Sequence, residues 1–312
     1  MASFPVSDGP HNDDWKALLR PCFAVIDEVI QDHGVAFPIQ IGGGSMLLRR
    51  YRHRKSKDLD LFVTDTQLAR WCSPRFNETA ADLFPDYGED AVMTKLIIGM
   101  QEIDIIAAAP IVLEGAVDEA EFEGRTLLIE RPREILAKKV AYRGRLFQPR
   151  DIFDLACIAE AEPDEVAAVL PWLSLAHAID LEARLAELAP ILGAELANKV
   201  EPYAEFEHLR DSCLDIAAGV VRSWKENLTP AVEIPPHPTG YRVLFSRDGR
   251  SVVIKEVDPD TGRAGKLSNP LGPAVVSVDA GPEWYIGGVK LSEREWREQA
   301  AKVAARMRGP TQ

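Results

Sequence analysis

Apolar residues recur at helical spacing over residues 13–33, and Gly34 ends that run. A short strand is predicted in FPIQI (37–41), which ends in glycines, and helical spacing resumes in SMLLRRYR (45–52). From Asp58 to Val63 carboxylate and apolar side chains alternate, as in a strand with one wet face. The predicted order is therefore helix, strand, glycine turn, helix and strand.

Further along, helix-like spacing covers residues 64–85, and three more strands are predicted around 92–99, 102–109 and 122–130. From Pro132 onward the pattern is helical, over 132–144, 149–161, 163–178 and 180–200. Pro132, Pro149 and Pro163 each fall where proline suits the first turn of a helix. We therefore expect a mixed sheet with flanking helices over residues 1–130 and a helical region over 131–228.

The C-terminal part has a different pattern. Residues 229–240 hold four prolines and predict an extended linker. After it, strand-like alternation surrounds an Asp248-Gly249 turn, and short strands follow at 274–278 and 283–289. A last helix is predicted over 292–307, with Ser292 and Glu295 as a capping box. The predicted fold class is α/β (α+β), with a small β-rich appendage at 241–312.

Composition narrows the class of protein. At 312 residues and 46% hydrophobic content the chain can bury a core, and a net charge of −13 argues against a basic nucleic-acid coat protein. Any polyanion must therefore be bound locally. The four widely spaced cysteines predict buried thiols in a reducing compartment, and the N-terminus lacks the pattern of a secretion signal. Without an apolar run long enough for a membrane span, a cytoplasmic protein is expected.

The candidate chemistry lies between Gly42 and Val63. Asp58 and Asp60, two apart on a strand, point to the same face, and such close carboxylates are unfavourable unless a cation joins them. Mg²⁺, or Mn²⁺, suits such oxygen ligands and leaves positions for the phosphates of an NTP. The preceding glycine turn would let backbone N–H groups approach a triphosphate. The alternatives are an ordinary glycine loop and a solvated strand face.

The conjunction of these parts is more specific than each alone. Strand, Gly43-Gly44-Ser45, short helix and Asp-x-Asp resemble the signature of the DNA polymerase β-like nucleotidyltransferase superfamily. Two blocks are similar to AbiEii/AbiGii-type toxin nucleotidyltransferases. The first is Gly43-Gly44-Ser45 with HRKSKDLDLF (53–62), and the second is PREILAKKVAYRGRLFQPRDIFDL (132–155). The resemblance covers roughly residues 37–156 and says nothing of residues 229–312.

The resemblance implies site residues. Asp58 and Asp60 would be metal ligands, Gly43, Gly44 and Ser45 would hold the triphosphate, and Lys139 would contact nucleotide phosphate, with Lys138 as an open alternative. Asp154 would be the downstream catalytic aspartate, and Asp151 a second acidic residue at the nucleotide. The superfamily that the chain resembles often uses a third strand carboxylate. Asp104 is the candidate, catalytic and metal-binding, because Glu102 and Asp104 share one face of a predicted strand while Ile103 and Ile105 point inward; a solvated strand edge is the alternative.

A dense basic run precedes the aspartates and bears on the acceptor. It is either a solvated helix face or a positive surface for nucleic acid; its cations are Arg49, Arg50, Arg52, Arg54, Lys55 and Lys57. A second basic cluster occupies residues 131–150. The resemblance implies transfer of NMP from an NTP to RNA, with the 3′ end of tRNA as the expected acceptor. It also implies that the protein is the toxin of a type IV-like toxin–antitoxin or phage-defence pair and has a cognate antitoxin. A protein hydroxyl or a small molecule such as an aminoglycoside as acceptor, and a non-catalytic nucleotide-binding module, remain alternatives.

Overall fold

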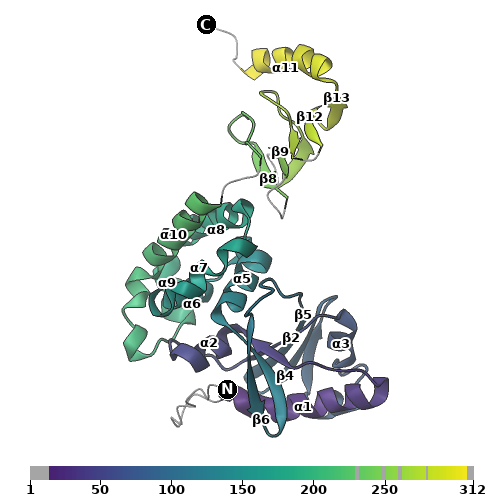
Figure 1. Ribbon diagram of the computed structural model, residues 1–312, viewed down its shortest axis with the longest axis vertical. Helices are drawn as coiled ribbons and strands as arrows, with labels where there is room; N and C mark the ends of the chain where they lie inside the picture. Colours follow the sequence, from purple (N-terminus) through teal and green to yellow (C-terminus); the bar gives the residue numbers. More distant parts are fainter. Residues whose placement is uncertain (1–13, 229–231, 247–250, 259–261, 279, 308–312) are drawn as a thin grey trace. The chain divides into compact units, whose positions relative to one another are not determined.

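The structure is a computed structural model that describes residues 14–228, 232–246, 251–258, 262–278 and 280–307. Two compact units are present. Unit 1 takes in the chain up to Trp172 together with Leu181–Val221, and unit 2 comprises Leu173–Asp180 and the chain from Arg222 onward. The predicted core and most of the predicted helical region thus form one unit. Figure 1 shows the elements of both units.

Unit 1 is built on a seven-stranded mixed sheet in the order β3-β4-β5-β2-β1-β7-β6. At its centre β2 (Leu59–Val63) pairs in parallel with β5 (Gln101–Ala107) and antiparallel with β1 (Gln40–Gly42), which runs parallel to β7 (Arg125–Glu130). The outer strands are β3 (Asp86–Glu89), β4 (Met93–Ile98) and β6 (Val117–Phe122). A mixed sheet flanked by helices confirms the predicted fold class.

One face of this sheet is apolar and covered by helices. Leu59, Leu61, Ile103 and Ile105 are fully buried, as the alternating pattern predicts for one side of β2 and β5. The hydroxyl of Thr94 in β4, on that side, donates to the Ala69 carbonyl, which places α3 there. The helices of this layer are α1 (Asp14–His33), α3 (Thr66–Trp71) and α4 (Glu78–Leu83) (Figure 1).

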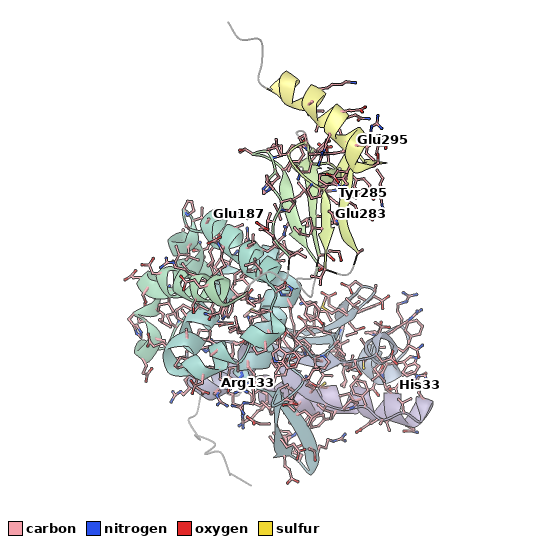
Figure 2. The ribbon with its side chains drawn as sticks, turned by 45° about the horizontal axis from the view of Figure 1, so that its top comes forward. His33, Arg133, Glu187, Glu283, Tyr285 and Glu295 are labelled. Carbon is pink, nitrogen blue, oxygen red and sulfur yellow. The ribbon has the colours of Figure 1, made fainter. Side chains whose placement is uncertain are left out.

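Side-chain contacts between its helices stabilise this layer. The ring of His33, labelled in Figure 2 at the end of α1, stacks on Trp71 with ring centroids 3.9 Å apart. The amide of Asn77 donates to the Val25 carbonyl. The helix predicted over 13–33 is therefore confirmed, with Pro21 inside it. The run 64–85 contains two helices rather than one element, because Asn77 caps a new helix by accepting from the Ala80 N–H.

The sequence patterns missed two strands at the sheet edges. β3 and β6 consist of exposed and half-exposed residues, so they lack the buried apolar period that marks a strand. β6 joins β7 through Glu123 and Gly124, whose φ values of 49° and 77° suit a two-residue hairpin turn. Both strands are thus held by backbone pairing rather than by a buried face.

The opposite face of the sheet is covered by helices that carry polar side chains. α2 (Gly43–Tyr51) follows β1 directly, and α5 (Pro132–Arg143) follows β7. α6 (Pro149–Ala161) and α7 (Pro163–Ala167) begin at the predicted prolines, and α9 (Leu192–Lys199) packs on α6. Short 3-10 turns lie at η1 (Gly144–Leu146), η2 (Leu170–Trp172) and η3 (Ala204–Phe206). Within this layer Arg133 of α5, labelled in Figure 2, pairs with Glu165 of α7 at 2.7 Å.

Two helices run from one unit into the other, α8 (Leu175–Leu188) and α10 (Leu209–Asn227). The predicted helices over 163–178 and 180–200 are both interrupted, near Pro171 and Pro190, because proline cannot donate to the helical ladder. The predicted linker at 229–240 falls within unit 2, of which residues 229–231 are not described.

The C-terminal part of unit 2 is a six-stranded sheet. Its order is β10 (Ala264–Leu267), β9 (Ser251–Val257), β11 (Val275–Ser277), β12 (Gly281–Ile286) and β13 (Val289–Leu291), and β8 (Arg242–Phe245) also pairs with β9. Val232, Val252 and Ile254 form its core. This confirms the predicted β-rich appendage; the Asp248-Gly249 turn lies outside the described residues.

The last helix, α11 (Glu293–Met307), packs on this sheet. The indole N–H of Trp296 donates to the Asn269 carbonyl at 2.8 Å, and the centroids of the Trp296 and Trp284 rings lie 4.4 Å apart. Glu295, labelled in Figure 2, accepts from the Ser292 N–H, as the predicted capping box requires.

The four cysteines are buried and free. Over the described ranges, no helix is long and apolar enough to cross a membrane.

Candidate active site

Three sequence-predicted residues meet on adjacent strands of unit 1. Asp60 of β2 lies in register with Gly42 of β1 on one side and with Asp104 of β5 on the other. Asp58 precedes β2 and shares the face of Asp60, because side chains two apart along a strand point the same way. The parallel pairing of β2 with β5 therefore brings together the carboxylates of Asp60 and Asp104, which are far apart in the sequence.

The glycine turn lies against these carboxylates. Gly43 has a φ of +70°, which only glycine adopts readily, and a Cβ at this position would lie 1.8 Å from Asp60 Oδ2. A Cβ at Gly44 would lie 2.7 Å from Nη2 of Arg54. Both glycines therefore let the start of α2 approach charged side chains closely, and their backbone faces the space above Asp60.

The carboxylates are electrostatically unfavourable as they stand. Burial and the charge of Asp104 raise the pKa of Asp60 to about 6, although Arg143, Lys139 and Arg150 act in the opposite direction. Burial and the charge of Glu102 likewise raise the pKa of Asp58. A cation between these groups would remove the repulsion, as the sequence pattern predicts.

Asp104, the predicted third carboxylate, is engaged by a lysine. Nζ of Lys95 on β4 lies 3.1 Å from Asp104 Oδ1 and also pairs with Glu102. Lys95 faces Asp104 because the two residues are register partners in the β4–β5 pair. Its ammonium group thus supplies one positive charge beside the carboxylates. The only sequence signal for Lys95 is the alternation of residues 92–99, which predicts a strand but no role for this lysine.

The donor set fits a divalent cation of the Mg²⁺ type. Oδ1 of Asp58 is buried without a hydrogen-bond partner, so one hard oxygen is left to accept a ligand. Over the described part of the chain, no three His, Cys, Asp or Glu side chains converge as a metal-binding group. Mg²⁺ commonly takes only one or two protein carboxylates and fills its other positions with water and phosphate. The pair Asp58 and Asp60 satisfies that requirement.

A buried ion network centred on Asp154 lies next to the glycine turn. Arg54 makes two hydrogen bonds to Asp154 of α6, at 2.7 and 2.9 Å, and Nε2 of His53 lies 2.7 Å from the same carboxylate. Burial alone would raise the pKa of Asp154, but the charges of Arg54 and Lys139 and the contact with His53 hold it well below its usual range. Burial lowers the pKa of His53, so a neutral ring with its proton on Nε2 fits this contact.

Lys139 of α5 belongs to the same network. Its Nζ lies 2.9 Å from Asp154 Oδ2 and also pairs with Asp151. Asp151 in turn accepts from the Gln148 N–H at the start of α6. Asp151 and Asp154 are fully buried and do not line the cavity described below. In this structure the two aspartates pair with Lys139, and Asp154 also pairs with Arg54; the predicted catalytic role of Asp154 and the predicted place of Asp151 at the nucleotide stay predictions.

Lys138 and Lys139 both border the cavity but have different partners. Lys138 pairs with buried Glu130, at 2.5 Å, and its Nζ lies 3.7 Å from the centre of the Phe62 ring. The positive charge of Lys139, by contrast, acts on Asp60 and helps to lower its pKa. Lys139 is thus among the cations whose charge acts on Asp60.

A cavity of about 420 Å³ opens over these groups. Gly43, Gly44, Asp58, Asp60, Asp104 and Lys139 all line it, as do Tyr142, Ile106 and Val92 on an apolar side. Its charged lining comprises five carboxylates, Asp58, Asp60, Glu102, Asp104 and Glu130, and six cations, Arg54, Lys95, Lys138, Lys139, Arg143 and Arg150. A cavity of this size with both charges suits a polar ligand of nucleotide size.

Ser45 does not line this cavity. It is buried, and its hydroxyl donates to the Asp58 carbonyl and lies 3.0 Å from the Ser56 hydroxyl. Its hydroxyl thus contacts the segment that leads into β2, and the predicted contact of Ser45 with triphosphate stays a prediction.

The predicted basic run divides between buried and exposed cations. Arg54 is buried in the ion network rather than exposed, and its predicted role in RNA binding stays a prediction. Arg50 is half-buried and pairs with Glu162 at 2.6 Å. The exposed members are Arg49, Arg52, Lys55 and Lys57. Arg52 has a φ of 55°, and its guanidinium lies 5.7 Å from the centre of the Tyr203 ring.

A glycine turn that approaches an Asp-x-Asp strand, a neighbouring strand carboxylate and a cation-lined cavity together define a nucleotidyltransferase-type site. The model of the family "Nucleotidyl transferase AbiEii toxin, Type IV TA system" matches residues 40–215. The chain belongs to this AbiEii family of nucleotidyltransferase toxins, which confirms the resemblance and implies a cognate antitoxin.

The other comparisons add little. A crystal structure of an H. pylori protein assigned as a nucleotidyltransferase is 16% identical, with a TM-score of 0.40, and the match covers 70% of this chain and 97% of that one. A comparison with curated proteins finds no match.

Proposed function

We propose that this toxin is a Mg²⁺-dependent enzyme that transfers NMP from an NTP to the 3′ end of an RNA, with tRNA as acceptor. Family membership supports nucleotidyl transfer and the toxin role. The observation that carries the metal-dependent chemistry is the register of Asp60 with Asp104 beside the close approach of Gly43. Asp58, Asp60 and Asp104 are the proposed catalytic carboxylates.

Different residues of the cavity would bind the triphosphate and the divalent cation. The backbone of Gly43 and Gly44 and the charge of Lys139 would hold the triphosphate, with Arg143 and Arg150 bordering the same space. Asp58 and Asp60 would hold a divalent cation, which when bound supplies positive charge against the triphosphate and the leaving pyrophosphate. Transfer of this kind depends mainly on positioning and charge stabilisation, so buried Asp154 contributes by fixing Arg54 and Lys139.

Surface charge supports a polyanionic acceptor. Arg49, Arg52, Lys55 and Lys57 are exposed and lie within nine positions of one another in a chain of net charge −13. An isolated basic surface on an acidic protein suits a nucleic-acid backbone better than a small sugar. The choice of tRNA rests on resemblance to the toxin family.

The acceptor can be tested directly. The protein is incubated with Mg²⁺, each α-labelled NTP in turn, and total RNA beside total protein, with Asp58→Asn as the matched variant. We expect label in RNA of tRNA size with wild type and none with the variant. Label only in protein, or in no macromolecule, would contradict the proposed acceptor and favour a protein hydroxyl or a small molecule.

A further inference from the structure

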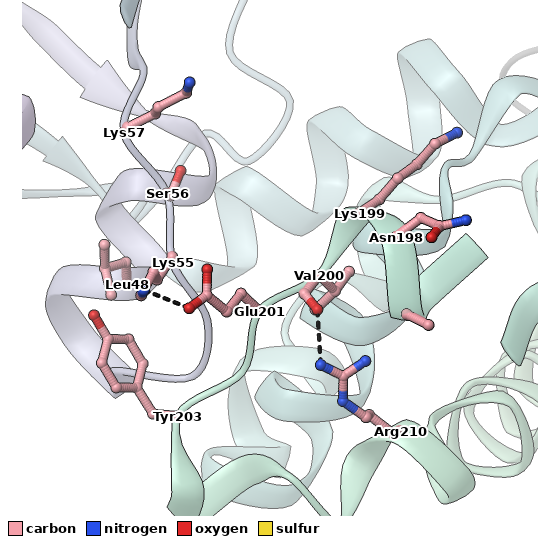
Figure 3. A pocket seen from close by; sticks show the side chains of 11 residues that line it. Leu48, Lys55, Ser56, Lys57, Asn198, Lys199, Val200, Glu201, Tyr203 and Arg210 are labelled. Atoms are coloured by element: carbon pink, nitrogen blue, oxygen red, sulfur yellow. Dashed lines mark hydrogen bonds and ion pairs between the residues drawn. The ribbon is translucent and has the colours of Figure 1, made fainter. Parts of the chain in front are cut away.

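A second cavity, of about 600 Å³, lies in unit 1 beside the candidate active site. One wall is the segment Lys55–Lys57 that leads into β2, and the other is the end of α9 with the residues up to Tyr203 (Figure 3). Ser56 lines both this cavity and the one over Asp60. A ligand in the second cavity would therefore lie next to the site of nucleotidyl transfer.

Backbone contacts hold the two walls together. The Lys55 N–H donates to the Glu201 carbonyl at 2.9 Å, and the Tyr203 N–H donates to the His53 carbonyl at 3.1 Å. Nη2 of Arg210 donates to the Val200 carbonyl at 3.0 Å, which satisfies a carbonyl just beyond the end of α9 (Figure 3). The cavity is thus formed before any ligand binds, so binding does not have to order its walls.

Cations outnumber carboxylates in this cavity. Lys55, Lys57, Lys199 and Arg210 line it, against Glu201 alone. Figure 3 shows Lys57 on one wall and Lys199 on the other, beside the amide of Asn198. Two of the lysines are exposed and pair with carboxylates near the surface: Lys55 with exposed Glu201, and Lys199 with half-exposed Glu195 at 2.5 Å. Exposed pairs of this kind are weak, so a phosphate can replace the carboxylate.

We propose that this second cavity binds the sugar-phosphate backbone of the RNA acceptor just before the end that receives the nucleotide, with Lys57 and Lys199 as its phosphate contacts. The proposal rests on the proposed function. Two lysines on facing walls suit consecutive phosphates of one strand, and contacts to phosphate carry no sequence information. The cavity should therefore strengthen RNA binding without selecting among RNA sequences.

The test is Lys199→Ala, assayed by transfer of α-labelled NTP to a tRNA preparation over a range of RNA and salt concentrations. We expect KM for the RNA to rise by about threefold to tenfold, and the slope of log KM against log salt to fall by about 1. Lys199→Arg should restore most of the affinity and Lys199→Glu should weaken it further. Lys16→Ala removes a lysine from α1, outside both cavities, and should change neither quantity.

The outcomes separate this inference from the proposed function. If wild type labels RNA, but Lys199→Ala and Lys199→Glu keep its KM and salt slope, the cavity does not bind the acceptor and the inference fails alone. If wild type labels protein or nothing, the proposed function fails first. Thermal unfolding of each variant, compared with wild type, checks that the exposed substitutions leave the fold intact.

Discussion

At the scale of single residues, Asp60 combines an unfavourable position with a proposed function. Its pKa of about 6 exceeds the value near 3.9 of an unfolded chain, so the folded protein binds more protons between these pH values. Its contribution to stability is complete below about pH 4 and is lost as the pH rises through 6. In metal-free protein at pH 8, Asp60→Asn should therefore increase the free energy of unfolding by about 1–3 kcal/mol, and with Mg²⁺ present the same substitution should abolish transfer.

Urea unfolding with a chelator at pH 8 and at pH 5 measures this effect. The gain from Asp60→Asn should shrink at pH 5, and Mg²⁺ should raise the thermal midpoint of wild type but not of the variant. Equal destabilisation by Asp60→Asn at both pH values would show that the carboxylate is not strained. The neighbouring surface variant Asp65→Asn, whose carboxylate accepts from the Gln67 N–H at the start of α3, serves as a control that should show no gain at pH 8.

At the scale of elements, α6 connects the glycine turn to α5 through one buried carboxylate. Asp154 is the common acceptor of Arg54, His53 and Lys139. Asp154→Ala would leave these donors buried without it, which should destabilise the protein by about 3–5 kcal/mol. Denaturant unfolding measures the loss, and Asp27→Ala, which removes a half-exposed partner of Arg125 at 2.7 Å, should cost much less. Similar losses for both variants would contradict the central place of Asp154.

The same elements show what the sequence could predict. The helices that begin at Pro132, Pro149 and Pro163, and the buried strand β2, follow from local signals and are found as predicted. Edge strands β3 and β6 have no apolar period, so only their pairing reveals them. Asp58 and Asp60 share a face by local geometry, whereas the burial of Arg54 by Asp154 depends on packing between residues 100 positions apart.

At the scale of the whole molecule, the family match and the candidate site fall in the same part of the chain. The match covers residues 40–215, and both cavities are lined by residues of unit 1. The six-stranded sheet of unit 2 lies beyond the match. The sequence could predict that sheet from its alternation and its turns, but not a role for it, because its described core is apolar packing around Val252 and Ile254.

The central claim is that the carboxylates of β2 and β5 serve nucleotidyl transfer. The most direct measurement compares NTP labelled at the α-phosphate with NTP labelled at the γ-phosphate, incubated with Mg²⁺ and RNA and with wild type or Asp60→Asn. We predict that wild type leaves α label, and no γ label, on the RNA, and that Asp60→Asn leaves neither. Transfer of γ label, or undiminished transfer of α label by a folded Asp60→Asn, would contradict this account.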